Sequence, residues 1–290
     1  MRFFLMFILV VFLLTSCDIK GVESTGVKEK VVSETEALVQ EVKVKNDSAS
    51  KPKEVVIDLA SDTLKLENGI TITYFKKGKG KQLKKDDVIM IDYRAKLEDG
   101  TVYDGNHLVK KQSIPFIVDW NQQTPGWDIA LKELRVGDDV DIFLPAKYAR
   151  GKNGIKGIVP PNANNIISMR IVEKVKPSVE IDGVKVWKYD ELKEPGDSIK
   201  KNDEVLINYW VSSESKPRYD NSYQRGKSFK LKIGDGNIVP GLHKALRFAR
   251  EGDRLMILIP AKEAYGNEGL IEMVKPGEDI FYDVQVAKVE

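Results

Sequence analysis

Apolar residues recur along the chain in the short alternating runs that are typical of strands. Residues 69–75 alternate apolar and hydroxyl side chains, and residues 88–97 present two distinct faces. Further apolar runs occupy residues 114–118, 139–144 and 166–175. The pattern therefore predicts five strands in this part of the chain.

A helical pattern interrupts these strands once. Thr124-Pro125-Gly126 precedes an apolar stripe at spacings of three and four residues, and Gly137 follows it. The stripe consists of Trp127, Ala130, Leu131 and Leu134. One short helix among several strands predicts an α+β domain, in which an antiparallel sheet packs on a single helix.

The same pattern returns in the second half of the chain. Strands are predicted at residues 184–189, 204–211, 255–259 and 280–287, with a helix that begins at Pro240. In the last strand, alternate residues mark one inner face, as expected for a half-buried strand. The helical stripe consists of Leu242, Ala245, Leu246 and Ala249.

Matching residues in the two halves lie at nearly one spacing. Pro145 lies 115 residues before Pro260, and Gly126 lies 115 before Gly241. The spacing is 116 from Tyr93 to Tyr209 and from Asp104 to Asp220, and 113 from Phe116 to Phe229. This spacing suits two tandem domains and is too long for a solenoid repeat. We therefore predict domains at residues 61–176 and 177–290, with a joint at 177–183.

The N-terminus has the features of a targeting segment. A single positive charge precedes an unbroken apolar run at residues 3–14, which is too short to span a bilayer as a helix. Leu-Thr-Ser-Cys follows at residues 14–17 and resembles the lipobox of bacterial lipoproteins. We predict a signal peptide at residues 1–16 and lipidation of Cys17, the alternative being an unmodified thiol.

These features predict a protein that is lipid-anchored to a bacterial membrane in the cell envelope, with its domains extracytoplasmic. Residues 17–60 are rich in Lys, Glu, Val and Ser, and the first aromatic residue after the signal peptide is Tyr74. This composition predicts a flexible tether. Ser33 and Glu36 fit a capping box, so a short partner-binding helix within the tether is the alternative.

Composition and charge exclude several classes of function. The chain has 46 basic and 44 acidic residues, scattered along its length, so we expect no nucleic-acid partner. The only histidines, His107 and His243, fall in different repeats, and Cys17 is the only cysteine. Neither a zinc spacing nor a phosphate loop is present, and we expect no metal and no cofactor.

Two matching stretches contain the candidate chemistry. In residues 252–269 an apolar strand stops at Pro260 and gives way to Tyr265 on a glycine-bounded loop, which places a phenol at the rim of a core. Residues 137–151 are an earlier copy of this stretch, but Arg150 stands where the later copy has Tyr265. The two domains are therefore expected to differ in function.

Together these anchors resemble the FKBP-type peptidyl-prolyl cis-trans isomerases over residues 67–176 and 181–290. The markers of the second copy are Tyr-Asp at 219–220, Ile-Val-Pro-Gly-Leu at 238–242, Ile-Pro-Ala-Lys-Glu-Ala-Tyr-Gly at 259–266 and Phe-Tyr-Asp-Val-Gln-Val at 281–286. The resemblance implies two tandem FKBP-like domains, each a twisted antiparallel sheet wrapped on one short helix, and an apolar pocket between helix and sheet.

The resemblance also implies a set of site residues in the second copy. Its catalytic residues would be Tyr265, Asp220 and Tyr219. Its substrate-binding residues would be Tyr209, Phe229, Ile238, Val239, Leu242, Met273, Val274 and Tyr282. At the start of the helix, where the family often has Trp, this copy has Leu242, which gives the pocket a smaller floor.

The first copy keeps the floor of the implied pocket but changes its rim. The retained residues are Tyr93, Tyr103, Asp104, Phe116, Trp127, Ile158, Val159 and Ile167. Gln123 and Thr124 replace the apolar pair before Pro-Gly, and Arg150 replaces the loop tyrosine. Those positions grip the substrate backbone in the family, so the first domain is expected to be degenerate.

Three hypotheses follow. The first is a peptidyl-prolyl isomerase that assists folding of envelope proteins, acting on proline-containing segments of unfolded or partly folded chains mainly through the second domain. The second is a non-catalytic chaperone or binding lipoprotein that holds such segments in the same pockets. The third is a structural lipoprotein with two inert copies as spacers, which predicts that neither domain binds peptide.

Overall fold

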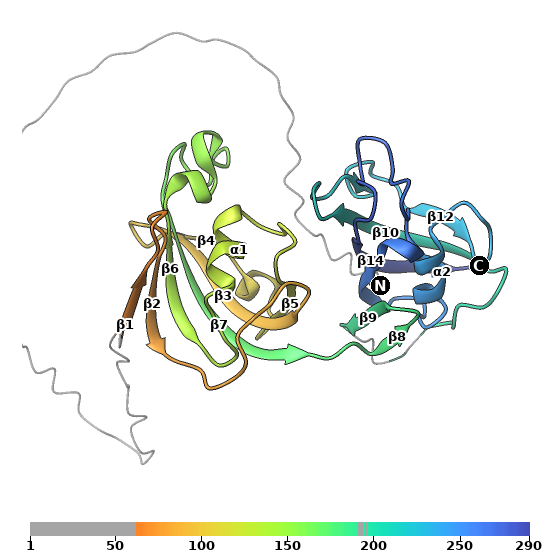
Figure 1. Ribbon diagram of the computed structural model, residues 1–290, viewed down its shortest axis with the longest axis horizontal. Helices are drawn as coiled ribbons and strands as arrows, with labels where there is room; N and C mark the ends of the chain where they lie inside the picture. The colour runs from red at the N-terminus through yellow and green to blue at the C-terminus, as the bar shows by residue number, and fades with distance from the viewer. Residues whose placement is uncertain (1–61, 191–193, 195) are drawn as a thin grey trace, which may run out of the picture. The chain divides into compact units, whose positions relative to one another are not determined.

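The computed structural model describes residues 62–190, 194 and 196–290 (Figure 1). The signal peptide, Cys17 and the tether with its alternative helix, all predicted within residues 1–60, lie outside the described residues. Within the described ranges, no helix combines the length and apolar character needed to cross a bilayer.

The first domain is a seven-stranded antiparallel sheet with one α-helix, α1, at Pro125–Leu131. The strands run in the order β1-β2-β6-β7-β3-β4, and β5 pairs with β3. Their bounds are β1 Asp62–Lys65, β2 Thr71–Lys76, β3 Val88–Leu97, β4 Val102–Gly105, β5 Ile114–Ile117, β6 Asp139–Leu144 and β7 Asn165–Val175. Three short 3₁₀ turns, η1 Asn106–Val109, η2 Ala146–Tyr148 and η3 Gly151–Asn153, lie in its loops.

The second domain repeats this arrangement around helix α2, Pro240–Leu246 (Figure 1). Its strand order is β11-β10-β14-β13-β9-β8, and β12 pairs with β10. The strands are β8 Val179–Ile181, β9 Val184–Tyr189, β10 Glu204–Ser213, β11 Asp220–Asn221, β12 Phe229–Lys232, β13 Arg254–Ile259 and β14 Ile280–Val289, with a 3₁₀ turn, η4, at Ala261–Glu263. The prediction of two α+β domains, each an antiparallel sheet with one short helix, is confirmed.

Each helix buries its apolar stripe against its own sheet. Leu242, Ala245 and Leu246 of α2 are buried in one core with the inward residues of β9 and β13, and α2 packs on both strands. A Cβ on Gly241 would lie 2.3 Å from Cγ2 of the buried Ile259. Glycine in the Pro-Gly opening of the helix therefore permits this close approach of helix to sheet.

The helix α1 is shorter than its apolar stripe predicted. It ends at Leu131 rather than near Gly137, although Leu134 is still fully buried. Beyond the helix, the Leu134 N–H still donates to the Leu131 carbonyl oxygen, but the Leu134 carbonyl oxygen and both backbone groups of Val136 bond to residues 80–83. The spacing of the apolar residues indicates that the segment is buried, but it does not distinguish a helix from the turn that follows it.

The predicted joint at residues 177–183 contains part of the second sheet. Val179–Ile181 forms β8, which pairs with β9 as an edge strand. Val179 and Ile181 are half-buried and pack against the second core. Two apolar residues in alternation were too few to be recognised as a strand.

A third apolar cluster contains residues from both sheets, all within one compact unit of the chain. Its members are Val88, Ile117, Trp120, Trp187, Met256, Leu258 and Phe281. The rings of Trp120 and Phe281 lie 5.7 Å apart, and the Arg218 guanidinium donates to the Gln122 carbonyl oxygen over 3.1 Å. The two domains are thus in contact, a feature about which the sequence analysis made no prediction.

Candidate functional site

A cavity of about 380 Å³ opens in the second domain between helix α2 and the sheet. It is lined by Tyr209, Val211, Tyr219, Asp220, Phe229, Asn237, Ile238, Val239, Leu242, Tyr265, Leu270, Met273 and Tyr282. Eleven residues of this domain were predicted as site residues, and all of them except Val274 line the cavity. Val274 is buried in the core and bridges to Leu270 across the turn below the rim.

The floor of the cavity is made of aromatic rings on three different strands. The Tyr209 ring on β10 meets Phe229 of β12 edge-on at 5.9 Å and Tyr282 of β14 at 5.6 Å. Leu242, at the start of α2, is buried beside them. Because each ring comes from a paired strand, the sheet holds the floor in a fixed shape.

Asp220 is the anionic group of the cavity, and its partners hold it in place. The Tyr209 hydroxyl donates to Asp220 Oδ2, the Arg225 guanidinium pairs with Oδ1, and Arg225 also donates to the Tyr209 oxygen over 3.1 Å. Burial raises the pKa of Asp220, but these hydrogen bonds outweigh it, so the pKa lies below its usual value. Burial raises the pKa of Tyr209 to about 12. The site therefore keeps a carboxylate and a protonated phenol at neutral pH.

Two further phenols line the cavity and remain available as donors. The Tyr219 hydroxyl is buried, and no hydrogen-bond partner for it exists in the described part of the chain. Burial raises the pKa of Tyr219 and of Tyr265, so both stay protonated. A buried hydroxyl without a partner is costly, and a bound ligand would supply the missing acceptor.

Sequence reasoning missed four residues of this site. Val211 could have been found, because it shares the inward face of β10 with Tyr209 two residues earlier. Asn237 and Leu270 lie on loops without any periodic pattern. Arg225 belongs to a loop after β11, and only the fold brings its side chain to Asp220.

The first domain builds a comparable aromatic floor. Trp127, at the start of α1, lies 5.1 Å edge-on from Tyr93 and 5.5 Å from Phe116 in a stacked geometry. Tyr103 packs against this core. These nominated residues are therefore brought together, as is Ile167 in the same core.

The remaining predicted residues of the first domain match their counterparts only in part. Val159 is buried, as Val274 is, whereas Ile158 is 42% exposed on the loop after η3. Asp104 accepts a hydrogen bond from the backbone N–H of Gly105 over 2.8 Å, as Asp220 does from that of Asn221. Arg150 donates from Nη2 to Gln123 Oε1 over 3.0 Å, so the two replaced rim residues hold one another.

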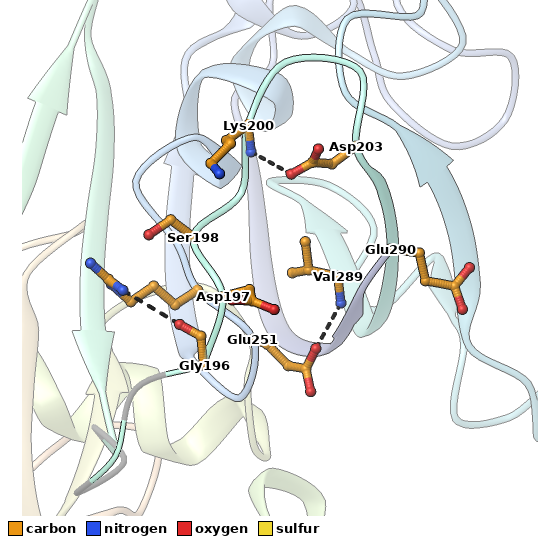
Figure 2. A pocket seen from close by; sticks show the side chains of 9 residues that line it. Gly196, Asp197, Ser198, Lys200, Asp203, Glu251, Val289 and Glu290 are labelled. Carbon is orange, nitrogen blue, oxygen red and sulfur yellow. Dashed lines mark hydrogen bonds between the residues drawn. The ribbon is translucent and has the colours of Figure 1, made fainter.

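A second hollow in the second domain, about 690 Å³, has a different character (Figure 2). It is polar, and none of the nominated residues lines it. Two of its carboxylates are already occupied: Asp203 accepts the Lys200 backbone N–H, and Glu251 accepts that of Val289. The aromatic cavity, rather than this hollow, is the candidate functional site.

Comparison with known families agrees with this assignment. The model of the FKBP-type peptidyl-prolyl cis-trans isomerase family matches the chain twice, at residues 79–171 and 196–287. These two matches cover more than half of the chain. The protein therefore belongs to the FKBP-type peptidyl-prolyl cis-trans isomerase family.

Individual relatives match over part of their length. The chain is 26% identical to peptidyl-prolyl cis-trans isomerase FKBP9 of Homo sapiens over 205 residues, which is 70% of this chain and 35% of that protein. It is 29% identical to a probable FKBP-type peptidyl-prolyl cis-trans isomerase FkpA of Neisseria meningitidis serogroup B over 106 residues, which is 37% of this chain and 38% of that protein. The chain thus spans about a third of the length of these relatives.

Among solved structures, a crystal structure of the three FKBP domains of wheat FKBP73 matches with a TM-score of 0.37 and 23% identity. The match covers 77% of this chain and 96% of that chain.

Proposed function

We propose that this protein is a peptidyl-prolyl cis-trans isomerase whose catalytic site is the aromatic cavity of the second domain. The observation that supports the proposal most directly is that cavity itself. Its rings come from three strands, and it holds phenols that remain donors. Membership in the FKBP-type family and the two family matches support the same activity.

The chemistry needs no nucleophile. Rotation about an X-Pro bond is slow because amide resonance imposes a barrier of roughly 18–20 kcal/mol. The planar amide is strongly dipolar, whereas the twisted transition state has lost that resonance. An apolar cavity that excludes water therefore disfavours the planar form relative to the twisted one, and this differential binding lowers the barrier.

The polar groups of the cavity would orient the substrate. A phenol such as Tyr265 can donate to a substrate carbonyl oxygen and hold one side of the rotating bond still. Tyr219 offers a second hydroxyl that lacks an internal acceptor among the described residues. Asp220 is fixed by Tyr209 and Arg225, so it presents a charge of constant position at the edge of the cavity.

The Tyr265→Phe variant tests the role of the loop phenol. It removes one hydrogen bond donor and keeps the ring, so we expect kcat/KM for a prolyl tetrapeptide to fall about fivefold to tenfold, the effect of roughly one hydrogen bond. The rate is measured without a coupling protease, by NMR exchange between the cis and trans signals of the peptide.

Tyr148→Phe is the matched control, because Tyr148 lies in the equivalent loop region of the first domain. We expect this variant to isomerise the peptide at the wild-type rate. Unchanged turnover in Tyr265→Phe, with the fold intact, would show that the phenol is not used.

A second candidate function is the holding of unfolded segments without catalysis. It is favoured by the loop beside the cavity, where Leu270 lines the rim and Ile271 is 89% exposed. An apolar side chain in this position suits contact with an extended client chain. Peptide binding to the second domain without accelerated exchange would select this function over isomerisation.

We further propose that the protein acts in the cell envelope of a bacterium, anchored to a membrane through lipidated Cys17, on proline-containing segments of unfolded or partly folded envelope proteins. The support is the sequence alone: an apolar run at residues 3–14 directly followed by Leu-Thr-Ser-Cys. One acyl chain binds a protein to a membrane only weakly and reversibly, whereas two chains give stable attachment. A diacylated Cys17 would therefore suffice as an anchor.

Expression of the full chain with labelled fatty acid tests the anchor. We expect label in the wild-type protein and its recovery in the membrane fraction. Cys17→Ser should abolish both the label and the membrane recovery. A labelled Cys17→Ser variant, or an unlabelled wild-type protein, would contradict the proposal.

A further inference from the structure

Three polar residues of the first domain occupy the positions at which the second domain lines its cavity. At the constant offset of 115 residues, Gln123 corresponds to Ile238, Thr124 to Val239 and Arg150 to Tyr265. All three counterparts line the aromatic cavity. At these three positions polar side chains therefore replace apolar or aromatic ones, which changes the chemistry of the site there.

The aromatic floor beneath these residues is retained. Tyr93, Phe116 and Trp127 still meet as edge-on and stacked rings, and all three are buried. The first domain thus keeps the aromatic floor of the second and replaces the phenol of Tyr265 by the cation of Arg150.

The hydrogen-bonding capacity of this cation is only partly used. Arg150 donates from Nη2 to Gln123, and its charge and a hydrogen bond also lower the pKa of the Tyr103 hydroxyl against the effect of burial, while its Nε–H is buried and has no hydrogen-bond partner in the described ranges. In the described part of the chain, no carboxylate pairs with the Arg150 guanidinium at the 4.0 Å limit of an ion pair. A guanidinium held in place with a free donor is suited to a carboxylate, which it binds through parallel hydrogen bonds.

Thr124, which follows Gln123, the hydrogen-bond partner of Arg150, provides a second unused donor. It is 8% exposed, and its hydroxyl has no hydrogen-bond partner among the described residues. Thr124 has the extended backbone of an N-cap residue, yet its side chain makes no capping hydrogen bond to α1. The hydroxyl is therefore free to bind another group, and leaving it buried and unpaired is unfavourable.

The nearby acid does not neutralise this site. Asp104 accepts the Gly105 backbone N–H, and its charge contributes to raising the pKa of Tyr93, a shift caused mainly by burial. Its carboxylate makes no ion pair with Arg150 in the part of the chain that the structure describes. The Arg150 guanidinium can therefore still form an ion pair with a carboxylate from outside.

We propose that the first domain is a peptide-binding site selective for a carboxylate, which Arg150 and Thr124 bind while an adjacent apolar side chain packs on the aromatic floor. The proposal does not depend on catalysis in either domain. It concerns the first domain only, so it can fail while the isomerase assignment of the second domain stands, and the reverse.

The four tryptophans allow this site to be observed separately in the full chain. Trp127 lies in the first floor, whereas the second cavity has Leu242 at the equivalent position, so the Trp127 indole N–H signal reports on the first domain alone. The signal is assigned with Trp127→Phe. The probe is an N-acetylated, C-amidated peptide Ala-Leu-Glu-Pro-Phe, compared with the same peptide in which Gln replaces Glu.

We expect the Glu peptide to shift the Trp127 signal with an affinity about tenfold higher than that of the Gln peptide, as for one charge-assisted pair. Arg150→Gln should remove this preference. Thr124→Val should weaken binding of the Glu peptide a fewfold. Lys152→Gln, which removes an exposed cation of the same loop, is the matched control and should keep the preference.

A third peptide separates the two sources of a carboxylate. The Gln peptide with a free C-terminus would bind more tightly than the Glu peptide if the site takes chain ends, and more weakly if it takes acidic side chains. Equal affinities for all three peptides, or an undiminished preference in Arg150→Gln with an intact fold, would overturn the proposal, as would a Trp127 signal that none of the peptides shifts.

Discussion

Ile238→Gln, Val239→Thr and Tyr265→Arg, introduced together, should lower kcat/KM for a prolyl peptide by at least about 100-fold, or about 2.7 kcal/mol of transition-state stabilisation. These changes install the rim of the first domain in the second. All three residues line the cavity. A guanidinium and two polar groups would bring dipoles and water into it, so the planar amide would no longer be disfavoured relative to the twisted one.

The measurement is cis/trans exchange by NMR with the full chain, combined with urea unfolding to show that the variant is folded. The reciprocal set, Gln123→Ile, Thr124→Val and Arg150→Tyr, serves as the matched control, because it leaves the second cavity intact and should not reduce the rate. Retention of more than a tenth of the activity by the first variant would place catalysis outside the aromatic cavity.

The fold of each domain could be predicted from the sequence because its signals are local. Strand β3 has two clear faces over ten residues, and a Pro-Gly pair marks the start of each helix. The end of α1 was not predicted, because the backbone partners of Leu134 and Val136 lie in residues 80–83, far away in the sequence. The edge strand β8 was not predicted although it pairs with the next strand, β9, because it has only two alternating apolar residues. The local pattern of apolar residues indicates which residues are buried, but it does not show which distant segment forms hydrogen bonds with them.

The contact between the two domains illustrates the same limit. In the last strand, the alternation of the sequence puts Tyr282 on the predicted inner face and Phe281 on the opposite face. That other face is also covered, since Phe281 is fully buried beside Trp120 of the first domain. Apolar residues on both faces of a strand indicate two covering layers, but not which part of the chain supplies the second.

The site was predictable only as far as a family motif extends. Most of the cavity residues lie at positions that the resemblance supplied, whereas Arg225 has no motif of its own. Its role in holding Asp220 depends on the folded loop, which brings its guanidinium to both Asp220 and the Tyr209 oxygen. The unpaired donors of Arg150 and Thr124 could likewise be recognised only from the structure.

A second carboxylate in the same domain has an environment opposite to that of Asp220. Asp283, on β14, accepts a hydrogen bond from the Tyr189 hydroxyl over 2.7 Å. Burial raises the pKa of Asp283 to about 6, although the Tyr189 hydroxyl and the charges of Arg254 and Arg218 act in the opposite direction. The folded protein therefore holds a proton at Asp283 between about pH 4 and pH 6 that the unfolded chain has already released.

Because the folded-state pKa is raised, Asp283 contributes its stability below about pH 4 and loses it as the pH rises through about 6. For a pKa that rises from 3.8 in the unfolded chain to about 6 in the folded protein, the loss is about 3 kcal/mol, at 1.36 kcal/mol for each pKa unit. Since the residue is partly accessible to solvent, we expect about 2 kcal/mol. Asp283→Asn keeps an acceptor for Tyr189 and has no proton to release.

The stability of Asp283→Asn relative to the wild type should therefore improve by about 2 kcal/mol between pH 4 and pH 7. Urea unfolding of the full chain, followed through NMR signals of the second domain, gives this difference, and the carboxyl carbon of Asp283 should titrate near pH 6. A relative stability that does not change with pH would mean that Asp283 titrates as it does in the unfolded chain. A change of opposite sign would mean that Arg254 and Arg218 outweigh burial and that Asp283 acts as a stabilising anion.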